Sequence, residues 1–260
     1  MTYKYYPGCT LRTKAKELDE YARKSMEALG VQASEPEDWQ CCGAVYPLGR
    51  DEVASRLAAI RVLVDARDEG KAVLTLCSAC HHVLKRVNHD MRTDGDIRRK
   101  VNNYLGLSEP YEGETEVTHF MEMLRDDVGF EGLKKKVKVP LSGRKIGAYY
   151  GCMLLRPGDV MAFDDAEDPR LLESFISALG AEPAVFSKRN ECCGSYGSFE
   201  DKPAVRRLSC AVLESAKEKG AQALVTACPL CRYNLGQNDL KEIMPVQYFT
   251  ELLAEALGVK

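Results

Sequence analysis

Cys41-Cys42-Gly43 is the stretch that decides the fold, because it occurs a second time as Cys192-Cys193-Gly194 in matching surroundings. In both copies, 34 residues separate the second cysteine from a Cys-x-x-Cys motif. These motifs are Cys77–Cys80 in the first copy and Cys228–Cys231 in the second. A chain that repeats two motifs at one spacing contains two related units.

A Gly-Cys pair precedes each copy, at the end of a short tyrosine-rich run. The two runs are Tyr5-Tyr6-Pro7-Gly8-Cys9 and Tyr149-Tyr150-Gly151-Cys152. Ten of the eleven cysteines therefore form two sets with one shared order. The first set is Cys9, Cys41, Cys42, Cys77 and Cys80, and the second set is Cys152, Cys192, Cys193, Cys228 and Cys231. The eleventh cysteine, Cys210, lies inside a helical pattern and is expected to be a small buried thiol.

The segments between the cysteines alternate between short apolar runs and amphipathic helical patterns. Residues 72–76 and 223–227 are apolar runs that suit buried parallel strands, and each leads directly into a cysteine. This alternation predicts an α/β fold of two tandem, pseudo-symmetric repeats, each with a small, mostly parallel sheet flanked by helices. Because ligands collect at the carboxyl ends of parallel strands, we expect a metal cluster at that edge of each sheet.

The two repeats differ in length. Cys41 and Cys192 are 151 positions apart, whereas the similar segments 117–124 and 246–253 are 129 positions apart. The first repeat therefore carries about 22 extra residues, which we place in a polar surface insertion near 90–114. We expect the first repeat to span 1–129, a lysine-rich linker 130–144 and the second repeat 145–260.

Composition limits the compartment and the partners. The net charge of −3 offers no basic face for a nucleic acid. No apolar run approaches the roughly 20 residues of a membrane span, and the N-terminus lacks the apolar segment of a signal peptide. We therefore expect a cytoplasmic protein, whose cysteines serve metal or redox chemistry more readily than structural disulfides.

Three kinds of site use cysteines in such numbers. Disulfides would require a strained bridge between the adjacent Cys41 and Cys42 and leave one of five thiols unpaired. Structural zinc takes four thiolates, which leaves the fifth without a role, although zinc in one set stays open as an alternative. Iron–sulfur clusters are held by thiolates, and a fifth thiolate favours a cluster other than the ordinary ferredoxin type.

The pattern Cys…Cys-Cys-Gly…Cys-x-x-Cys, present twice, resembles the cysteine-rich CCG-domain family of oxidoreductase subunits. Over the whole chain it is similar to the stand-alone subunit of heterodisulfide reductases that carries two complete CCG motifs. This resemblance implies two noncubane [4Fe-4S] clusters, with all five cysteines of the first set as metal ligands of one cluster and all five of the second set as ligands of the other. It assigns no catalytic residue beyond these ligands.

The resemblance also implies an activity and partners. In that family the disulfide of coenzyme M and coenzyme B, a compound of methanogenesis, is held between the two clusters and cleaved reductively. A small ferredoxin-like partner and a flavin-containing partner of the same complex would deliver the electrons, since no G-x-G-x-x-G follows a strand of this chain. Two alternatives remain: electron transfer in a flavin dehydrogenase or thiol:fumarate reductase complex without disulfide cleavage, and a structural zinc protein that acts as an interaction module.

Five side chains outside the two sets are candidates for supporting roles. His81 and His82 directly follow the first Cys-x-x-Cys, where a histidine can donate a proton to a product thiolate or bond a cluster sulfur. Arg50, Arg156 and Arg232 are candidates for binding an anionic group of the substrate, because guanidinium groups pair with sulfonate and phosphate.

Overall fold

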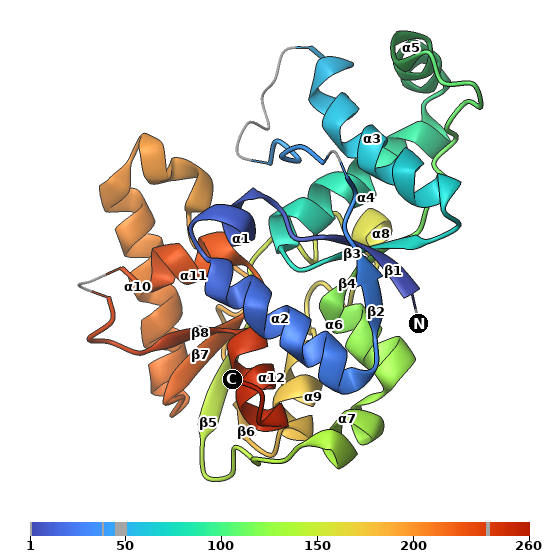
Figure 1. Cartoon of the computed structure of the whole chain (residues 1–260). Coiled ribbons are helices and arrows are strands. Elements are labelled where there is room, and N and C mark those ends of the chain that lie inside the picture. Colours follow the sequence, from blue (N-terminus) through green and yellow to red (C-terminus); the bar gives the residue numbers. More distant parts are fainter. Residues whose placement is uncertain (1, 38, 45–50, 238–239) are drawn as a thin grey trace.

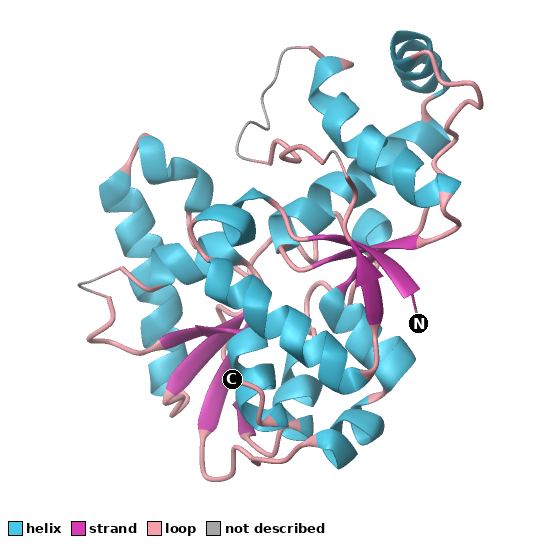
Figure 2. Ribbon diagram, in the orientation of Figure 1, coloured by secondary structure: helices cyan, strands magenta, loops and turns pink. Residues whose placement is uncertain are grey.

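The structure, a computed structural model, describes residues 2–37, 39–44, 51–237 and 240–260. It contains two four-stranded sheets whose strands are all parallel, each flanked by helices (Figures 1 and 2). The strand orders are β2-β1-β3-β4 and β6-β5-β7-β8, so each strand of one sheet has an equivalent in the other. The predicted α/β fold with two pseudo-symmetric repeats is confirmed.

The first repeat provides one sheet and the helices around it. Its strands are β1 (Thr2–Tyr6), β2 (Gln32–Ser34), β3 (Ala72–Thr75) and β4 (Val117–His119). Its helices are α1 (Cys9–Thr13), α2 (Lys16–Leu29), α3 (Ala54–Asp68), α4 (Ser78–Thr93), α5 (Gly95–Leu105), α6 (Phe120–Met123) and the π-helical turn η1 (Leu124–Val128). The segment 90–114 carries α5, which buries Ile97 and Val101.

The second repeat has the same order of elements. Its strands are β5 (Lys145–Tyr149), β6 (Glu182–Ala184), β7 (Ala223–Thr226) and β8 (Val246–Tyr248). Its helices are α8 (Gly158–Met161), α9 (Leu171–Ala178), the 3-10 turn η2 (Ser195–Phe199), α10 (Lys202–Glu218), α11 (Pro229–Leu235) and α12 (Phe249–Leu257). Within the segment 130–144, α7 (Phe130–Lys136) buries Leu133.

Local sequence explains where the long helices begin and end. In α2, Leu18, Ala22 and Met26 recur at helical spacing and are buried. Gly30 ends this helix in the left-handed conformation, which glycine adopts without steric cost. In α10, the Asp201 carboxylate accepts a hydrogen bond from the Ala204 amide and so caps the first turn.

Helices that pack across the boundary hold the two repeats together. α12 of the second repeat lies against α2 of the first, near the centre of Figure 1. The Thr250 hydroxyl donates a hydrogen bond to Leu18 O at 3.0 Å, and both residues are fully buried. α7 packs on α9, and α8 packs on α4. Buried side chains of both repeats therefore share a large apolar core, and the second repeat has a smaller core of its own.

The carboxyl ends of β3 and β7 meet at this boundary. The Ser78 hydroxyl donates a hydrogen bond to Ala227 O at 2.8 Å. The Tyr248 hydroxyl lies 2.5 Å from Leu76 O and 3.4 Å from Ala227 O, so it touches both strand ends. Leu76 and Ala227 directly precede the two Cys-x-x-Cys motifs, which the fold thereby brings face to face.

Candidate functional site

Each cysteine set lies at the carboxyl edge of its own sheet and has the same gradient of burial. The first member is half-buried, the second is exposed and the remaining three are buried in both sets. Three pairs of sulfur atoms lie 3.4 Å apart: Cys9 and Cys41, Cys42 and Cys80, and Cys193 and Cys231. All eleven cysteines are free thiols. The structure therefore brings the members of each predicted set together.

One tyrosine in each repeat ties the Cys-Cys-Gly turn to the sheet. The Tyr6 hydroxyl donates a hydrogen bond to Gln40 O at 2.6 Å, and the Tyr149 hydroxyl donates one to Glu191 O at 2.8 Å. Gln40 and Glu191 directly precede the paired cysteines. Sequence reasoning missed this contact, although the tyrosines before each Gly-Cys pair were a visible signal for it.

The glycine of each Gly-Cys pair allows a close approach to the Cys-x-x-Cys. A Cβ atom on Gly8 would lie 2.7 Å from the Cys80 sulfur, and one on Gly151 would lie 3.5 Å from the Cys231 sulfur. Both glycines have a positive φ angle, of 79° and 67°. Only glycine fits both requirements at the first position, which leaves the thiol edge open.

Hydrogen bonds among the thiols lower the pKa of some cysteines, which favours their thiolate form, and raise the pKa of others, such as Cys80 and Cys231. Bonds with Cys41 and Cys80 lower the pKa of Cys42 to about 4, and a bond with Cys152 lowers the pKa of Cys192 to about 6. A hydrogen bond with Cys228 of the other repeat raises the pKa of the fully buried Cys77. The two sets are thus in direct contact with one another. Thiolates are the nucleophiles and metal ligands of cysteine chemistry.

The position after each Cys-x-x-Cys faces an equivalent glutamate. Arg232 makes two bonds to Glu251, at 3.0 and 3.1 Å, and the equivalent His81 lies 3.4 Å from Glu122. Burial lowers the pKa of His81 well below its ordinary value and raises that of Glu122. Arg232, expected to bind an anionic substrate group, is instead paired within the protein.

The other candidate side chains have separate positions. His82 donates a hydrogen bond from Nδ1 to Met153 O at 3.0 Å, across the repeat boundary. Arg156 is partly exposed and bonds Asn190 O and Glu167 at 3.0 Å. Arg50 lies outside the described residues. Cys210 is half-buried against the core of the second repeat, less deeply than expected.

Two spaces adjoin the cysteines at the boundary. An open cavity of about 500 Å³ reaches Cys42 and is also lined by His82 and Arg86. A much smaller enclosed space, of about 20 Å³, adjoins Cys193. Met153 and Tyr196 of the second repeat line both spaces, and the Tyr196 hydroxyl lies 3.8 Å from the Met153 sulfur. This pair stands between the open cavity and the second set.

The donor chemistry of the two sets is consistent with iron–sulfur cofactors. Each set offers five thiols without a nitrogen or carboxylate donor, and thiolates are the usual ligands of such clusters. Among the described residues, no three or more His, Cys, Asp or Glu side chains converge as they do around a single bound ion. The glycine positions beside Cys80 and Cys231 keep side chains away from the thiol edge.

Comparison with known families gives one match that covers both repeats. The model of the cysteine-rich domain family, named CCG, matches residues 3–85 and 146–236. Among solved structures, a hypothetical protein from Helicobacter pylori superposes with a TM-score of 0.75 at 13% identity, over 100% of this chain and 49% of its own. That likeness concerns the fold alone.

Two relatives indicate the range of proteins with similar sequences. The chain is 34% identical to the 8-methylmenaquinol:fumarate reductase membrane anchor subunit of Wolinella succinogenes, over 99% of this chain and 92% of the relative. It is 27% identical to one subunit of the ferredoxin/F420H2-dependent CoB-CoM heterodisulfide reductase from Methanosarcina acetivorans, over 97% and 88%. Within the described part of this chain, no helix has the length and apolar character needed to cross a membrane.

Proposed function

This chain belongs to the cysteine-rich CCG-domain family, and on that premise we propose that it is the iron–sulfur subunit of an oxidoreductase complex that reductively cleaves a disulfide. In this proposal the first and second cysteine sets each bind one noncubane [4Fe-4S] cluster. The substrate is a small disulfide of the coenzyme M–coenzyme B type. Electrons come from two partners in the complex, one ferredoxin-like and the other flavin-containing.

The observation that carries the proposal is the contact between the two sets across the repeat boundary. The Ser78 hydroxyl donates a hydrogen bond to Ala227 O at 2.8 Å, and the Tyr248 hydroxyl lies 2.5 Å from Leu76 O and 3.4 Å from Ala227 O, directly before Cys77 and Cys228. The open cavity of about 500 Å³ begins beside Cys42 of the first set and ends at Met153 and Tyr196, in front of the second set. Cavities of this size hold small molecules. One molecule in this cavity would adjoin Cys42 and would be separated from the second set by Met153 and Tyr196.

Reductive cleavage of one disulfide consumes two electrons and two protons and yields two thiols. When bound, iron–sulfur clusters supply electrons singly, so one from each set would break the S–S bond. The residues of this chain hold the two sets at a fixed spacing through the shared core. Tyr196 and Met153 orient the disulfide by limiting its access to the second set, and the open side of the cavity admits water as the proton source.

Anaerobic turnover tests the proposal. The purified protein, loaded with iron and sulfide, would be mixed with reduced methyl viologen and a series of small disulfides. We expect two thiols to form for every two electrons that the viologen loses. Absence of thiol release from all disulfides, with viologen still oxidised by the protein, would contradict the proposal and leave electron relay as the function.

A second candidate function is electron relay without disulfide cleavage. It is favoured by the 34% identity to one component of an 8-methylmenaquinol:fumarate reductase, which extends over 99% of this chain. In this alternative the two adjoining sets would pass electrons from one partner to another within a fumarate reductase or flavin dehydrogenase complex. Fumarate reduction that depends on this chain, in a reconstituted complex without disulfides, would support it.

A further inference from the structure

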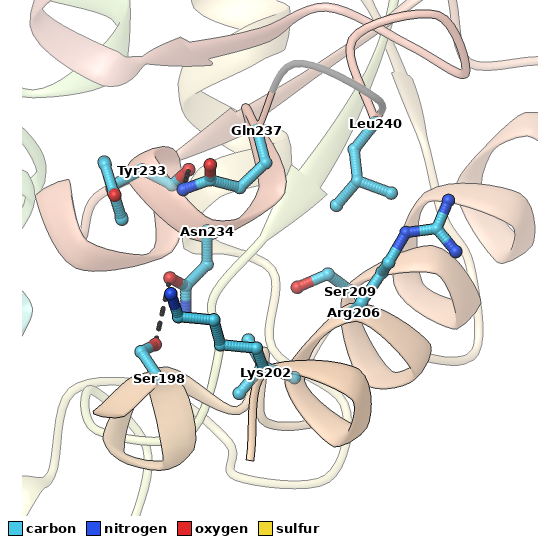
Figure 3. A pocket seen from close by; sticks show the side chains of 9 residues that line it. Ser198, Lys202, Arg206, Ser209, Tyr233, Asn234, Gln237 and Leu240 are labelled. Atoms are coloured by element: carbon cyan, nitrogen blue, oxygen red, sulfur yellow. Dashed lines mark hydrogen bonds between the residues drawn. The ribbon is translucent and has the colours of Figure 1, made fainter. Parts of the chain in front are cut away.

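One side-chain amide contacts a sulfur of the second cysteine set. The Asn234 amide donates a hydrogen bond from Nδ2 to the Cys193 sulfur at 3.8 Å, and both residues are buried, with 4% and 1% of their surface exposed. Asn234 lies on α11, three positions after the second Cys-x-x-Cys, and lines a cavity of about 260 Å³ between η2, α10 and α11 (Figure 3). It is neither a proposed cluster ligand nor part of the lining of the open cavity at the boundary.

A second contact fixes the direction of this amide. The Ser198 hydroxyl lies 3.3 Å from the Asn234 oxygen, the dashed line in Figure 3. The oxygen is therefore held away from the sulfur, and the NH₂ group faces Cys193. A thiolate sulfur only accepts hydrogen bonds, so the opposite orientation would place two acceptors against one another. The Ser209 hydroxyl separately donates a hydrogen bond to Cys193 O at 3.2 Å.

The first repeat has a different residue at the equivalent position. Asn234 corresponds to Val83, which lies 151 positions earlier and three positions after the first Cys-x-x-Cys. Among the described side chains other than the cysteines, the Thr10 hydroxyl alone lies within hydrogen-bond range of a sulfur in the first set, 4.0 Å from Cys9. Cys9 is half-buried, and solvent competes there with so long a bond. The two sets thus differ in one buried side-chain donor.

A donor at a cysteine sulfur changes how readily a metal centre takes up an electron. Each electron adds one negative charge that the thiolate sulfurs share, and a hydrogen bond to a sulfur strengthens as this charge grows. The donor therefore stabilises the reduced state more than the oxidised state and makes the reduction potential more positive. The effect is largest where water is excluded, as it is at Cys193.

We propose that Asn234 is a positioning residue that raises the reduction potential of the metal centre in the second set, and that Val83 leaves the first set without an equivalent. This inference rests on the proposed function, in which each set binds one iron–sulfur cluster. Asn234 acts through Cys193 and does not line the open cavity at the boundary. Two centres held by the same five thiols thus differ in how readily they accept an electron, and Asn234 favours reduction of the second.

A redox titration of the holoprotein, followed by electron paramagnetic resonance, tests this role. We expect Asn234→Val, which copies the first repeat, to make the potential of one centre more negative by about 59 mV, a tenfold change in a one-electron equilibrium constant. Val83→Asn, the matched exchange in the first repeat, should leave that centre unchanged. The same titration in a Cys42→Ala background, which removes the other centre, assigns the shifted transition to the second set.

Two serine variants separate the bond to sulfur from a general loosening of the structure. Ser198→Ala frees the amide to turn and should shift the same potential in the same direction by a smaller amount. Ser209→Ala removes a hydrogen bond to the oxygen of Cys193 rather than to its sulfur, and should shift the potential far less than Asn234→Val.

An unchanged potential in Asn234→Val, or an equal shift in Ser209→Ala, overturns the role of Asn234. If Asn234→Val shifts the potential but the wild-type holoprotein releases no thiol from any disulfide, the role of Asn234 stands and disulfide cleavage is rejected. Thiol release by the wild type together with an unchanged potential in Asn234→Val gives the reverse result.

Discussion

The two repeats present the same five thiols on equivalent strand ends, but they differ in the side chains around them. Equivalent features include the tyrosine tethers of Tyr6 and Tyr149 and the glutamates that face the residue after each Cys-x-x-Cys. In the first repeat the side chain that faces the glutamate is His81, whereas in the second repeat it is Arg232. Under the proposed function, the common parts support the two cysteine sets, and the unequal parts give each set different surroundings.

The difference is clearest in the surroundings of the paired cysteines. Beside Cys42, the open cavity is completed by Met153 and Tyr196 from the other repeat. Beside Cys193, a cavity of about 260 Å³ between η2, α10 and α11 is lined, among the described residues, by the second repeat alone. The duplicated unit thus carries two equivalent cysteine sets whose surroundings differ.

The largest expected effect comes from removing one thiol from either set. We predict that Cys42→Ala and Cys193→Ala each lose more than about 100-fold in disulfide reduction, since changes merely behind a metal ligand already cost roughly 10- to 100-fold. Iron analysis should show the loss of one cluster in each variant. Cys210→Ala, outside both sets, is the control with full activity. Full activity at half the iron content would contradict the prediction that disulfide reduction needs both cysteine sets.

A smaller effect separates the two glutamates. Glu251→Gln removes the charge that pairs with Arg232, and we expect it to cost about 1–2 kcal/mol in the free energy of unfolding, between the values for exposed and buried pairs. Glu122→Gln should cost less, because burial, which raises the pKa of Glu122, disfavours its charged form, and its cationic partner Lys85 lies at 3.5 Å rather than at 3.0 Å. Each glutamine keeps an oxygen that can accept the hydrogen bond from His119 N or Tyr248 N, which caps the start of α6 or α12.

Urea unfolding of the two variants measures this difference. Equal costs would mean that Glu122 carries a full charge in the folded protein, in the same way as Glu251. Arg170→Gln provides a reference, since Arg170 and its partner Asp168 are both more than half exposed and loss of this surface pair should change stability little.

The tyrosine tethers should behave alike in both repeats. Tyr6→Phe and Tyr149→Phe each remove one hydrogen bond to a carbonyl before the Cys-Cys-Gly turn, which we expect to cost about 1 kcal/mol in unfolding free energy. Both variants should also lose iron to a chelator faster than the wild type. Tyr104→Phe, at an exposed position, is the control. A clear effect in one repeat alone would contradict the proposed equivalence.

The last predicted effect appears only at acidic pH and is specific to the first repeat. Burial lowers the pKa of His119 to about 3, whereas the equivalent Tyr248 stays neutral at acidic pH because burial raises its pKa. In the unfolded chain His119 takes up a proton near pH 6.5, whereas in the folded protein it stays neutral at that pH. The free energy of unfolding therefore falls as the pH drops below about 6.5. At a pH of about 5.5 this contribution is about 1.4 kcal/mol.

His119→Tyr, which copies the residue of the second repeat, tests this dependence. The free energy of unfolding, measured with urea between about pH 7.5 and pH 5.5, should fall less steeply for the variant than for the wild type. The difference in slope corresponds to about one proton. An unchanged slope would assign the acid sensitivity to other groups.

The sequence predicted the fold class and the membership of both cysteine sets. It did so because β3 and β7 are continuous apolar runs that end at cysteines, a pattern that only buried parallel strands explain well. β6 escaped prediction, since its three residues include Pro183 and carry no alternating pattern. Strands this short are specified by their neighbours in the sheet.

The contact between the two sets and the partner of Arg232 were beyond the reach of sequence reasoning. The first depends on how α12 packs against α2, and apolar residues such as Leu252 show only that a helix is buried, not against what. The second depends on the position of α12, which follows β8 and places Glu251 beside Arg232 of α11, 19 positions earlier in the chain. Both are consequences of tertiary packing, which local patterns do not encode.

Anomalous diffraction at the iron edge, from crystals of the anaerobically purified protein, tests the central claim most directly. We predict two separate groups of iron atoms, one enclosed by each set of five thiols, with a spacing that a single disulfide can bridge. A lone zinc ion in either set, iron in one set alone, or a spacing too long for one disulfide to touch both groups would contradict the account.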